Sequence, residues 1–427
     1  MQHHDVGRRA VLAAAAAALA VPRAGAQLAA KPKVTVISQW SSGPSGAAMV
    51  ALGKEFEQQG GTWEHNPVPG FTTEMMNKLR AQIIAGDPPA ASQLKGPEIA
   101  AWSKIAPVVD LDATVQQAGY EAVVPAELVR LSKPHGQWIA LPIQAYRINT
   151  LFVSKKAADR IGLTTLPATW AAFNAAAEKM RAAAITPVAN GGIKWDDGMK
   201  WEIALCGISP EAYRKAVMQL DAKTLKGPEV LAAFRQFRKL GDWSDPGRAG
   251  QDYTTFIPRF MKGEMGMLLM GDWAAGVYKR GGFQVSDYMV GPAPTDDGKI
   301  AFDLNSDEFL FWQNKEPEFQ EGQRLLAKIV MGKEFGPLFC QITGSIPVRS
   351  DTDLSAAGFT NQQREASRSM GEATKANRIV LSLAHNMAQT NQITAAMIDV
   401  LTEFVHDNRI SPEDGQTRLS DAVDNVR

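Results

Sequence analysis

The sequence predicts an α/β protein built of two domains. In the first hundred residues, β-branched apolar runs alternate with stretches of helical spacing, which is typical of parallel sheets with crossover helices. The chain has 427 residues, more than one hydrophobic core usually supports. No low-complexity linker interrupts it. We therefore expect the chain to cross between its domains more than once, through structured segments.

Composition limits the classes of function. With 45% hydrophobic and 21% charged residues, the sequence is typical of a globular protein. Its formal net charge is zero and it has no basic block, so it lacks the electrostatic pattern of proteins that bind nucleic acids or anionic membranes. Cys206 and Cys340 lie far apart and outside metal-type spacings. Two buried thiols are the commoner arrangement, although an oxidising compartment permits a bridge.

The first 26 residues have the pattern of an export signal. Arg8-Arg9 precede an alanine-rich run too short to span a bilayer, and Ala24-Gly25-Ala26 fits the small-x-small cleavage pattern. The paired arginines resemble a twin-arginine signal, although Val11 stands where phenylalanine is usual. We expect residues 1–26 to be removed and the mature protein to work in the periplasm. An uncleaved membrane anchor is the alternative.

The mature chain opens with alternating elements. Lys33–Ser38 is rich in β-branched residues and predicts a strand, followed by a polar, glycine-rich turn that holds Trp40. Gly86-Asp87-Pro88-Pro89 ends a helix decisively. The other elements expected here are helices at Ala47–Gln58, Thr72–Ala85 and Pro97–Lys104, and strands at Trp63–Val68 and Ala91–Lys95.

The middle of the chain holds two candidate crossings between the domains. A strand at Trp138–Ile143 is followed by a polar step, Gln144–Ile148, and much later a strand returns at Ile300–Trp312. Asp296-Asp297-Gly298 before it is a hairpin-type turn. The remaining expectations are a strand at Thr150–Val153, a helix begun by Pro167–Trp170, and mostly helical structure over Ile203–Leu240, Glu316–Ile342 and Asn361–Asn408.

Met265–Gly276 combines three signals in a short segment. Gly263 ends the helix before it, and its run of Met and Leu predicts a short buried strand. Asp272 and Trp273 follow directly, at a strand's end, where open α/β folds place ligand contacts. Trp273 can equally be a core indole.

Several motifs occur in an order seen in one protein family. They are Trp40 after a strand, Ala85–Pro89, Trp138–Arg147, Pro167–Trp170, Gly271-Asp272-Trp273 and Gly344-Ser345-Ile346-Pro347. In this order, along nearly the whole mature chain, the sequence resembles the periplasmic sugar-binding proteins of bacterial ABC importers (extracellular solute-binding protein family 1). It is most similar to their glucose/mannose-binding subgroup.

The resemblance implies a two-lobed periplasmic-binding-protein fold of type II, with a ligand cleft between lobes joined by a multi-strand hinge. The expected amino-terminal lobe is residues 27–144 plus 296–345, and the carboxyl-terminal lobe is residues 145–295 plus 346–427. It further implies a monomer that closes on a sugar and delivers it to a membrane permease, without a cofactor, a metal or a nucleic-acid partner.

Matching the subgroup position by position implies a set of ligand contacts. Trp40 falls on a tryptophan that lines the cleft, Gln93 on a glutamine that bonds sugar hydroxyls, and Tyr253 on an aromatic ring that stacks on the sugar. Asp307 and His385 match an acid and a histidine of the pocket. Trp40 can also be a core residue, and His385 can also be a buried histidine that caps a helix.

Other matched positions depart from the subgroup. Lys95 stands where the subgroup has histidine, Thr343 where it has lysine, and Gln39 where it has a second tryptophan. Gln144 replaces an asparagine before the matched Arg147, which can alternatively pair with an acid at the hinge. These departures leave the identity of the solute open.

Physical chemistry favours a sugar as the solute. A pyranose has a C–H face that an aromatic ring can cover and a belt of hydroxyls that needs donors and acceptors. Lys95 and Arg147 suit a sugar acid or a glycerol phosphate, so an anionic or polyol solute is the alternative. A carbohydrate-active enzyme, the third class, needs two facing carboxylates, for which Asp272 and Asp307 are the candidates. The chain has no common hydrolase or phosphate-loop motif, and we therefore expect no enzyme.

Overall fold

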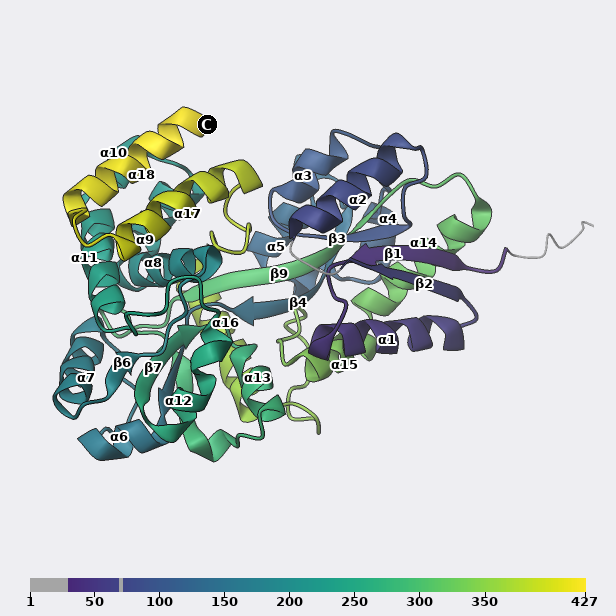
Figure 1. Cartoon of the computed structure of the whole chain (residues 1–427). Coiled ribbons are helices and arrows are strands. Elements are labelled where there is room, and N and C mark those ends of the chain that lie inside the picture. Colours follow the sequence, from purple (N-terminus) through teal and green to yellow (C-terminus); the bar gives the residue numbers. More distant parts are fainter. Residues whose placement is uncertain (1–29, 69–71) are drawn as a thin grey trace, which may run out of the picture.

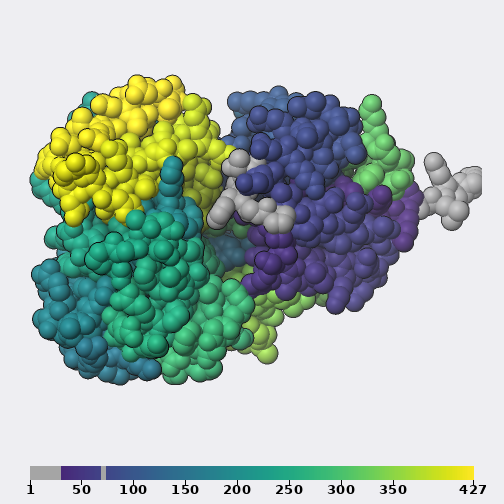
Figure 2. Space-filling view, in the orientation of Figure 1, coloured from purple at the N-terminus to yellow at the C-terminus, as the bar shows by residue number. Residues whose placement is uncertain are grey.

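The computed structural model describes residues 30–68 and 72–427 and shows two lobes, each with its own sheet and covering helices (Figure 1). The space-filling view shows the lobes meeting along a groove (Figure 2). The predicted two-lobed α/β architecture is confirmed, whereas the expected signal peptide lies outside the described residues. No helix within the described ranges combines the length and the apolar character that a membrane crossing requires.

The first lobe is built around β1 (Lys33–Ser38), whose Val34, Val36 and Ile37 are fully buried. Parallel neighbours β2 (Thr62–Pro67) and β3 (Ala91–Leu94) flank it, and two helices make the crossovers. The helices of this lobe are α1 (Gly43–Gln58), α2 (Thr72–Ile84), α3 (Glu98–Ser103), α4 (Asp112–Gln117), α5 (Ala126–Ser132), α14 (Pro317–Met331) and α15 (Phe335–Thr343).

Two long strands connect the lobes. β4 (Ala140–Arg147) lies antiparallel to β9 (Phe302–Phe311) along nearly its whole length. On its other edge, β9 pairs with β10 (Ile379–Leu381) of the second lobe and then with β3 of the first. Figure 1 shows β9 running from one lobe into the other. These shared strands form the hinge, and the chain returns to the second lobe after α15, where Ile346 bridges to the β4 backbone.

The second lobe has a four-stranded sheet with the order β6 (Thr186–Val188), β7 (Met265–Met270), β5 (Thr150–Ser154), β8 (Tyr288–Pro292). The helices of this lobe come from two distant parts of the chain. They are α6 (Lys155–Ile161), α7 (Trp170–Ala182), α8 (Lys194–Ile208), α9 (Pro210–Tyr213), α10 (Ala222–Leu225), α11 (Pro228–Asp242), α12 (Ile257–Lys262), α13 (Ala274–Arg280), α16 (Asn361–Lys375), α17 (Asn391–His406) and α18 (Pro412–Val426).

Local signals in the sequence set several element boundaries correctly. α12 ends at Gly263, whose φ of +78° is the left-handed conformation that favours glycine, and β7 follows as predicted. Thr169 caps α7 by accepting the N–H of Ala172. Cys206 and Cys340 are free buried thiols, in α8 and α15.

Three predictions were wrong in detail. The polar step at Gln144–Ile148 is a continuation of β4 as far as Arg147, because the backbone of this segment pairs with β9. The turn at Asp296–Gly298 joins two different sheets instead of closing a hairpin, since β8 pairs with β5. β10 was missed within a stretch expected to be helical, because three apolar residues are too few for a periodic signal.

Candidate ligand-binding cleft

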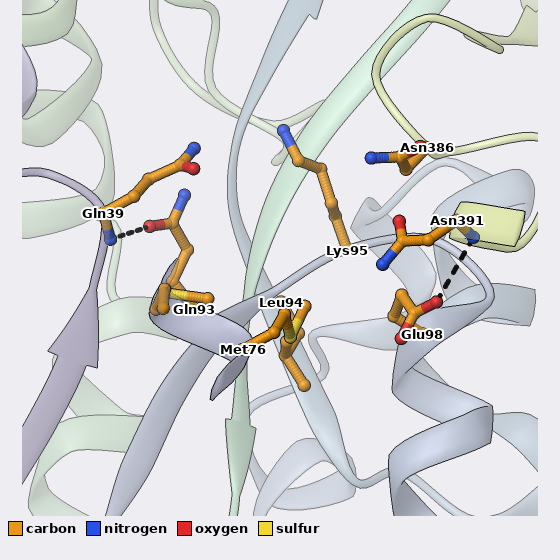
Figure 3. Close-up of a pocket in the computed structure, with 9 residues that line it drawn as sticks. Gln39, Met76, Gln93, Leu94, Lys95, Glu98, Asn386 and Asn391 are labelled. Atoms are coloured by element: carbon orange, nitrogen blue, oxygen red, sulfur yellow. Dashed lines mark hydrogen bonds between the residues drawn. The ribbon is translucent and has the colours of Figure 1, made fainter. Parts of the chain in front are cut away.

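A narrow cleft, open to solvent, lies between the lobes beside the hinge. Gln39, Gln93 and Lys95 of the first lobe line one side, and Asn386 and Asn391 of the second lobe line the other. Figure 3 shows Lys95 extending between the two glutamine amides and Asn386. Both lobes therefore contribute polar groups to one space. The remaining lining residues are Met75, Met76, Leu94 and Glu98.

Asp307, in the middle of β9, is the centre of a polar network beside this cavity. Gln93 Nε2 donates to one carboxylate oxygen at 2.9 Å, and Gln144 Nε2 donates to the other at 3.0 Å. Lys95 Nζ lies 3.5 Å from the first oxygen. Asp307 and both glutamines are almost fully buried. A buried carboxylate needs such partners. These hydrogen bonds fix the orientation of the Asp307 side chain and of the side chains that donate to it.

The network continues along β4 and the segment after α15. The Gln144 side-chain oxygen accepts hydrogen bonds from Tyr146 Oη (3.1 Å) and Ser345 Oγ (3.0 Å). Thr343 Oγ1 lies 2.7 Å from Ser345 Oγ. Burial, reinforced by the Asp307 and Asp272 carboxylates, raises the pKa of Tyr146 well above its usual value, so this phenol stays neutral. Thr343 thus belongs to the support of the network.

Arg147 is not brought to this cluster. Side chains alternate along a strand, so Gln144 and Tyr146 share one face of β4 while Arg147 projects from the other. Its guanidinium is fully buried against α16, with Nη2 2.8 Å from Glu365 Oε2 and Nη1 3.2 Å from Ser369 Oγ. Its Nε donates to Thr150 Oγ1. The structure therefore places Arg147 as a link between the hinge and α16.

Aromatic rings of the second lobe gather around His385. Trp273, directly after β7, has its ring centroid 5.3 Å from that of His385 and 5.8 Å from that of Tyr146. Trp195, near the start of α8, lies 6.0 Å from His385 and 6.4 Å from Tyr253. Trp195 and Trp273 are half-buried, whereas Tyr253 is 5% exposed. The two half-buried indoles keep surface available to a ligand.

Trp40 lies at the edge of the first lobe's core, and only 8% of it is exposed. Its ring packs against Phe339 of α15, 5.6 Å away between centroids, and against Phe309 of β9 at 6.1 Å. Its neighbour Gln39 lines the cavity and donates its backbone N–H to the Gln93 side chain. The contacts of Trp40 are thus mainly those of a core residue beside the cleft.

Charge within the cleft is limited. Burial, followed by the positive charges of Lys95 and Lys200, lowers the pKa of His385 to about 3, so its ring is neutral at physiological pH. Asp272 is buried at the hinge, where it accepts the backbone N–H of Arg147 at 3.0 Å, and burial raises its pKa to about 7. Lys95 and Asp307 are already paired.

Sequence reasoning missed Trp195, Tyr146, Ser345 and Asn386. The paired glycines before α8, which let the backbone of residues 248–253 approach closely, are the signal that marks the segment carrying Trp195. No comparable local signal marks Ser345 or Asn386. Among the described residues, no group of three or more His, Cys, Asp or Glu side chains is arranged to hold a metal ion.

Comparisons with known proteins place the chain in a family. Residues 51–366 match the model of a family described as bacterial extracellular solute-binding protein. A "probable sugar-binding periplasmic protein" of Brucella suis biovar 1 is 31% identical over 426 residues, which cover 99% of each chain.

Solved structures show the same fold. A chitin oligosaccharide binding protein superimposes with a TM-score of 0.76 at 20% identity, covering 92% of this chain and 98% of that chain. A bacterial solute receptor with an exclusive substrate preference for β-D-galactopyranose superimposes with a TM-score of 0.72 at 17% identity, covering 92% of this chain and 99% of that one.

Proposed function

This chain belongs to the bacterial extracellular solute-binding protein family, and from this premise we propose that it captures a sugar between its lobes for an ABC importer. One observation carries the proposal: the polar set anchored on Asp307 and the aromatic set around His385 meet beside one interlobe cleft. Tyr146 joins them through its ring contact with Trp273, and Asn386, next to His385, lines the cleft. The sugar-binding name of its Brucella relative supports the same substrate class.

The two sets match the two surfaces of a pyranose. The half-buried indoles of Trp195 and Trp273 suit its C–H face. The amides of Gln39, Gln93 and Asn386 both donate and accept, as a ring of hydroxyl groups requires. Asp307 accepts Nε2–H of Gln93 and so holds in place an amide that lines the cavity.

We propose a neutral sugar in preference to a sugar acid or a glycerol phosphate. Arg147, one of the two cations expected to hold an anion, is directed to Glu365 on the far face of β4. The other, Lys95, is paired with Asp307, and the Glu98 carboxylate lines the same cavity. An anionic solute would meet these carboxylates without an unpaired cation among the residues that line the cavity.

The closeness of the lobes favours a small ligand. They already touch beside the cleft, where Gly96 packs on the backbone of Asn386 and Met387. We therefore propose a monosaccharide; a short oligosaccharide would need the lobes to stand further apart.

We propose that delivery works by closure of the hinge. The lobes touch where Gly96, after β3, packs on the backbone of Asn386 and Met387. Nearby, the backbone N–H of Asn391 lies 3.4 Å from Glu98 Oε1. A ligand held by both lobes stabilises this closed arrangement through its differential affinity, and the permease would recognise the closed form.

The remaining expectations stand as parts of this proposal. They are a monomer in the periplasm, removal of residues 1–26, and lobes of residues 27–144 plus 296–345 and 145–295 plus 346–427. The strand β9, which pairs with β10 of the second lobe and with β3 of the first, supports a division near these boundaries.

The contacts of Asp307 and Asp272, the two candidate catalytic carboxylates, support a binding protein in preference to an enzyme. Asp307 is occupied by Gln93, Gln144 and Lys95, and Asp272 accepts a backbone N–H at the hinge. A glycoside hydrolase needs a free acid and a free base on either side of the scissile bond. Neither residue has that freedom.

A thermal-shift screen of the purified protein tests the proposal, with neutral monosaccharides, disaccharides, sugar acids and glycerol phosphates as ligands. A ligand that binds the native state alone raises Tm as its concentration exceeds Kd. We expect a shift with a neutral monosaccharide. A shift produced only by anionic compounds would overturn the choice of a neutral sugar, and unchanged Tm with every sugar would overturn the sugar itself.

A further inference from the structure

The loop Ser382–Met387, called here the cleft loop, carries His385 and Asn386 to the cleft. Ser382 closes the loop through its backbone: its N–H bonds Leu304 O of β9, and its carbonyl accepts the N–H groups of Met387 (2.9 Å) and Ala388 (3.1 Å). Asn386 adopts a left-handed φ of +58°. The position of the His385 ring therefore depends on how Ser382 is held.

Glu202 of α8 lies fully buried beneath the cleft loop. Its Oε2 accepts the backbone N–H groups of Leu383 (2.5 Å) and Ala384 (3.0 Å). The Tyr213 hydroxyl lies 3.1 Å from this oxygen and 2.9 Å from Leu381 O, and its one hydrogen serves one of the two acceptors. Its Oε1 accepts Ser382 Oγ–H at 2.8 Å. With three donors, two on Oε2 and one on Oε1, the Glu202 carboxyl is an acceptor at both oxygens.

The proton balance of this region involves Asp303 of β9, also fully buried. Neither Asp303 oxygen has a donor from another described residue, and its carboxyl interacts with that of Glu202. Two neighbouring buried carboxyls are not both ionised, because like charges disfavour each other in a low-dielectric interior. Burial raises the pKa of Glu202 to about 7 and that of Asp303 well above its usual value. Asp303 receives no donor from a described residue, whereas Glu202 receives backbone N–H groups and the Ser382 hydroxyl, so we assign the proton of the pair to Asp303 and the acceptor role to Glu202.

The number of hydrogens on the Ser382 hydroxyl determines the direction of its hydrogen bond with His385. Ser382 has a single hydroxyl hydrogen, and Glu202 Oε1 takes it. The other neighbour of Ser382 Oγ is His385 Nδ1, 2.9 Å away, which must therefore be the donor. A neutral imidazole with hydrogen on Nδ1 has a lone pair on Nε2. No described protein group bonds Nε2, and the ring is partly exposed beside Trp195 and Trp273.

We propose that Glu202, acting through Ser382, fixes His385 as the Nδ1–H tautomer, so that Nε2 accepts a hydrogen bond from a hydroxyl group of the bound solute. Glu202 is thus a positioning residue for specificity. The part that concerns the solute rests on the proposed sugar-binding function. The proposal requires a donor at this point of the ligand, so a sugar whose hydroxyl is replaced by a methoxy group there should lose most of its affinity.

Nitrogen NMR of the ligand-free protein tests the tautomer directly. Proton–nitrogen correlation spectra of imidazole rings distinguish a protonated nitrogen from an unprotonated one, and a His385→Asn sample assigns the signals. At pH 7.5 we expect His385 to carry hydrogen on Nδ1. Hydrogen on Nε2 in the wild-type protein would overturn the proposal without any need for a further variant.

Glu202→Gln tests the relay. The new amide keeps its oxygen for the N–H groups of Leu383 and Ala384 and turns its NH₂ toward Ser382. Ser382 must then donate to His385, which switches to the Nε2–H tautomer. We expect that switch, with at least a tenfold weaker affinity for the sugar found in the screen. An unchanged tautomer with unchanged affinity would overturn the proposal.

Two further variants separate the relay from general support of the fold. Ser382→Ala leaves the backbone bonds to Glu202 in place and removes only the hydroxyl, so both tautomers should become populated. Glu308→Gln is the matched control, because Glu308 is a fully buried acid that accepts a serine hydroxyl (Ser132, 2.5 Å) in the other lobe. Glu308→Gln should leave the His385 spectrum and the affinity unchanged, and a tautomer switch there would overturn the assignment to Glu202. If no sugar binds while the wild-type and Glu202→Gln spectra behave as expected, the proposed function fails and the relay stands.

Discussion

A methyl group at Gly96 is expected to hold the two lobes apart. A Cβ atom built on Gly96 would lie 2.1 Å from Asn386 O and 2.8 Å from Met387 Cα, both backbone atoms of the opposite lobe. Ordinary contacts of a Cβ begin near 3.4 Å. Gly96→Ala therefore forces this contact to open by more than 1 Å (3.4 − 2.1 = 1.3), which also breaks the already long Asn391 N–H to Glu98 bond.

The expected cost has two separate parts. Gly96 has a φ of +57°, and alanine in this left-handed region costs about 1 kcal/mol whether the lobes are open or closed. The steric conflict exists only in the closed form and, like other cases of overpacking, costs about 1–3 kcal/mol. Because the ligand binds the closed form, the second part appears in binding, as a Kd weakened about 5- to 150-fold.

Gly119→Ala is the matched control. Gly119 has nearly the same φ, +58°, but a Cβ there meets nothing within 4 Å. Denaturant unfolding should show a similar loss of stability, about 1 kcal/mol, in both variants. Calorimetric titration with the sugar should show weaker binding for Gly96→Ala alone, and small-angle scattering should show it more extended with ligand than the wild type. Wild-type affinity in a folded Gly96→Ala protein would refute the reasoning, because the bound form would then lack this lobe contact.

Three further predictions follow from the site. Arg147→Met should lower the free energy of unfolding by roughly 3 kcal/mol, because Glu365 and Ser369 lose their partner. The Kd for the sugar should stay within about threefold of the wild-type value. A large rise in Kd with an unchanged free energy of unfolding would place Arg147 in the ligand site after all. Trp40→Ala truncates a core residue and should lower the free energy of unfolding by about 3–5 kcal/mol. Trp273→Ala should instead weaken sugar binding by about 1–3 kcal/mol, with a smaller change in Tm. Weaker binding for Trp40→Ala and lower stability for Trp273→Ala, measured by ligand titration and unfolding, would contradict these placements. Tm should fall as pH rises from 6.5 to 8, because burial raises the pKa of Asp272 to about 7 and that of Glu308 to about 8, so the folded state holds protons that the unfolded chain has released. The window begins at 6.5, the usual pKa of histidine, because the lowered pKa of His385 acts in the opposite direction below it. Glu308→Gln should flatten this slope, and a Tm that rises over the same interval would count against the prediction.

The sequence by itself determined the structural features that depend on residues close together along the chain. Helix ends such as Gly263 and Thr169, the short apolar strand β7, and the delivery of Trp273 at its end all follow from contacts within a few residues. The order of such elements also indicated two lobes with several crossings. Spacing of apolar residues and the conformational preferences of glycine and proline act locally, so they can be read without the fold.

The tertiary structure decided the assembly of the site. Asp307 meets Gln93 and Gln144, which are 214 and 163 positions away in sequence, and no local pattern contains that information. β9 takes three different neighbours along its length, which fixes the register of β4 and sends Arg147 to α16 instead of the cleft. Successive side chains of a strand point to opposite faces of the sheet. The role of a residue therefore depends on which element packs against its face. The sequence supplied the candidate side chains, and the pairing of distant strands chose which of them face the ligand.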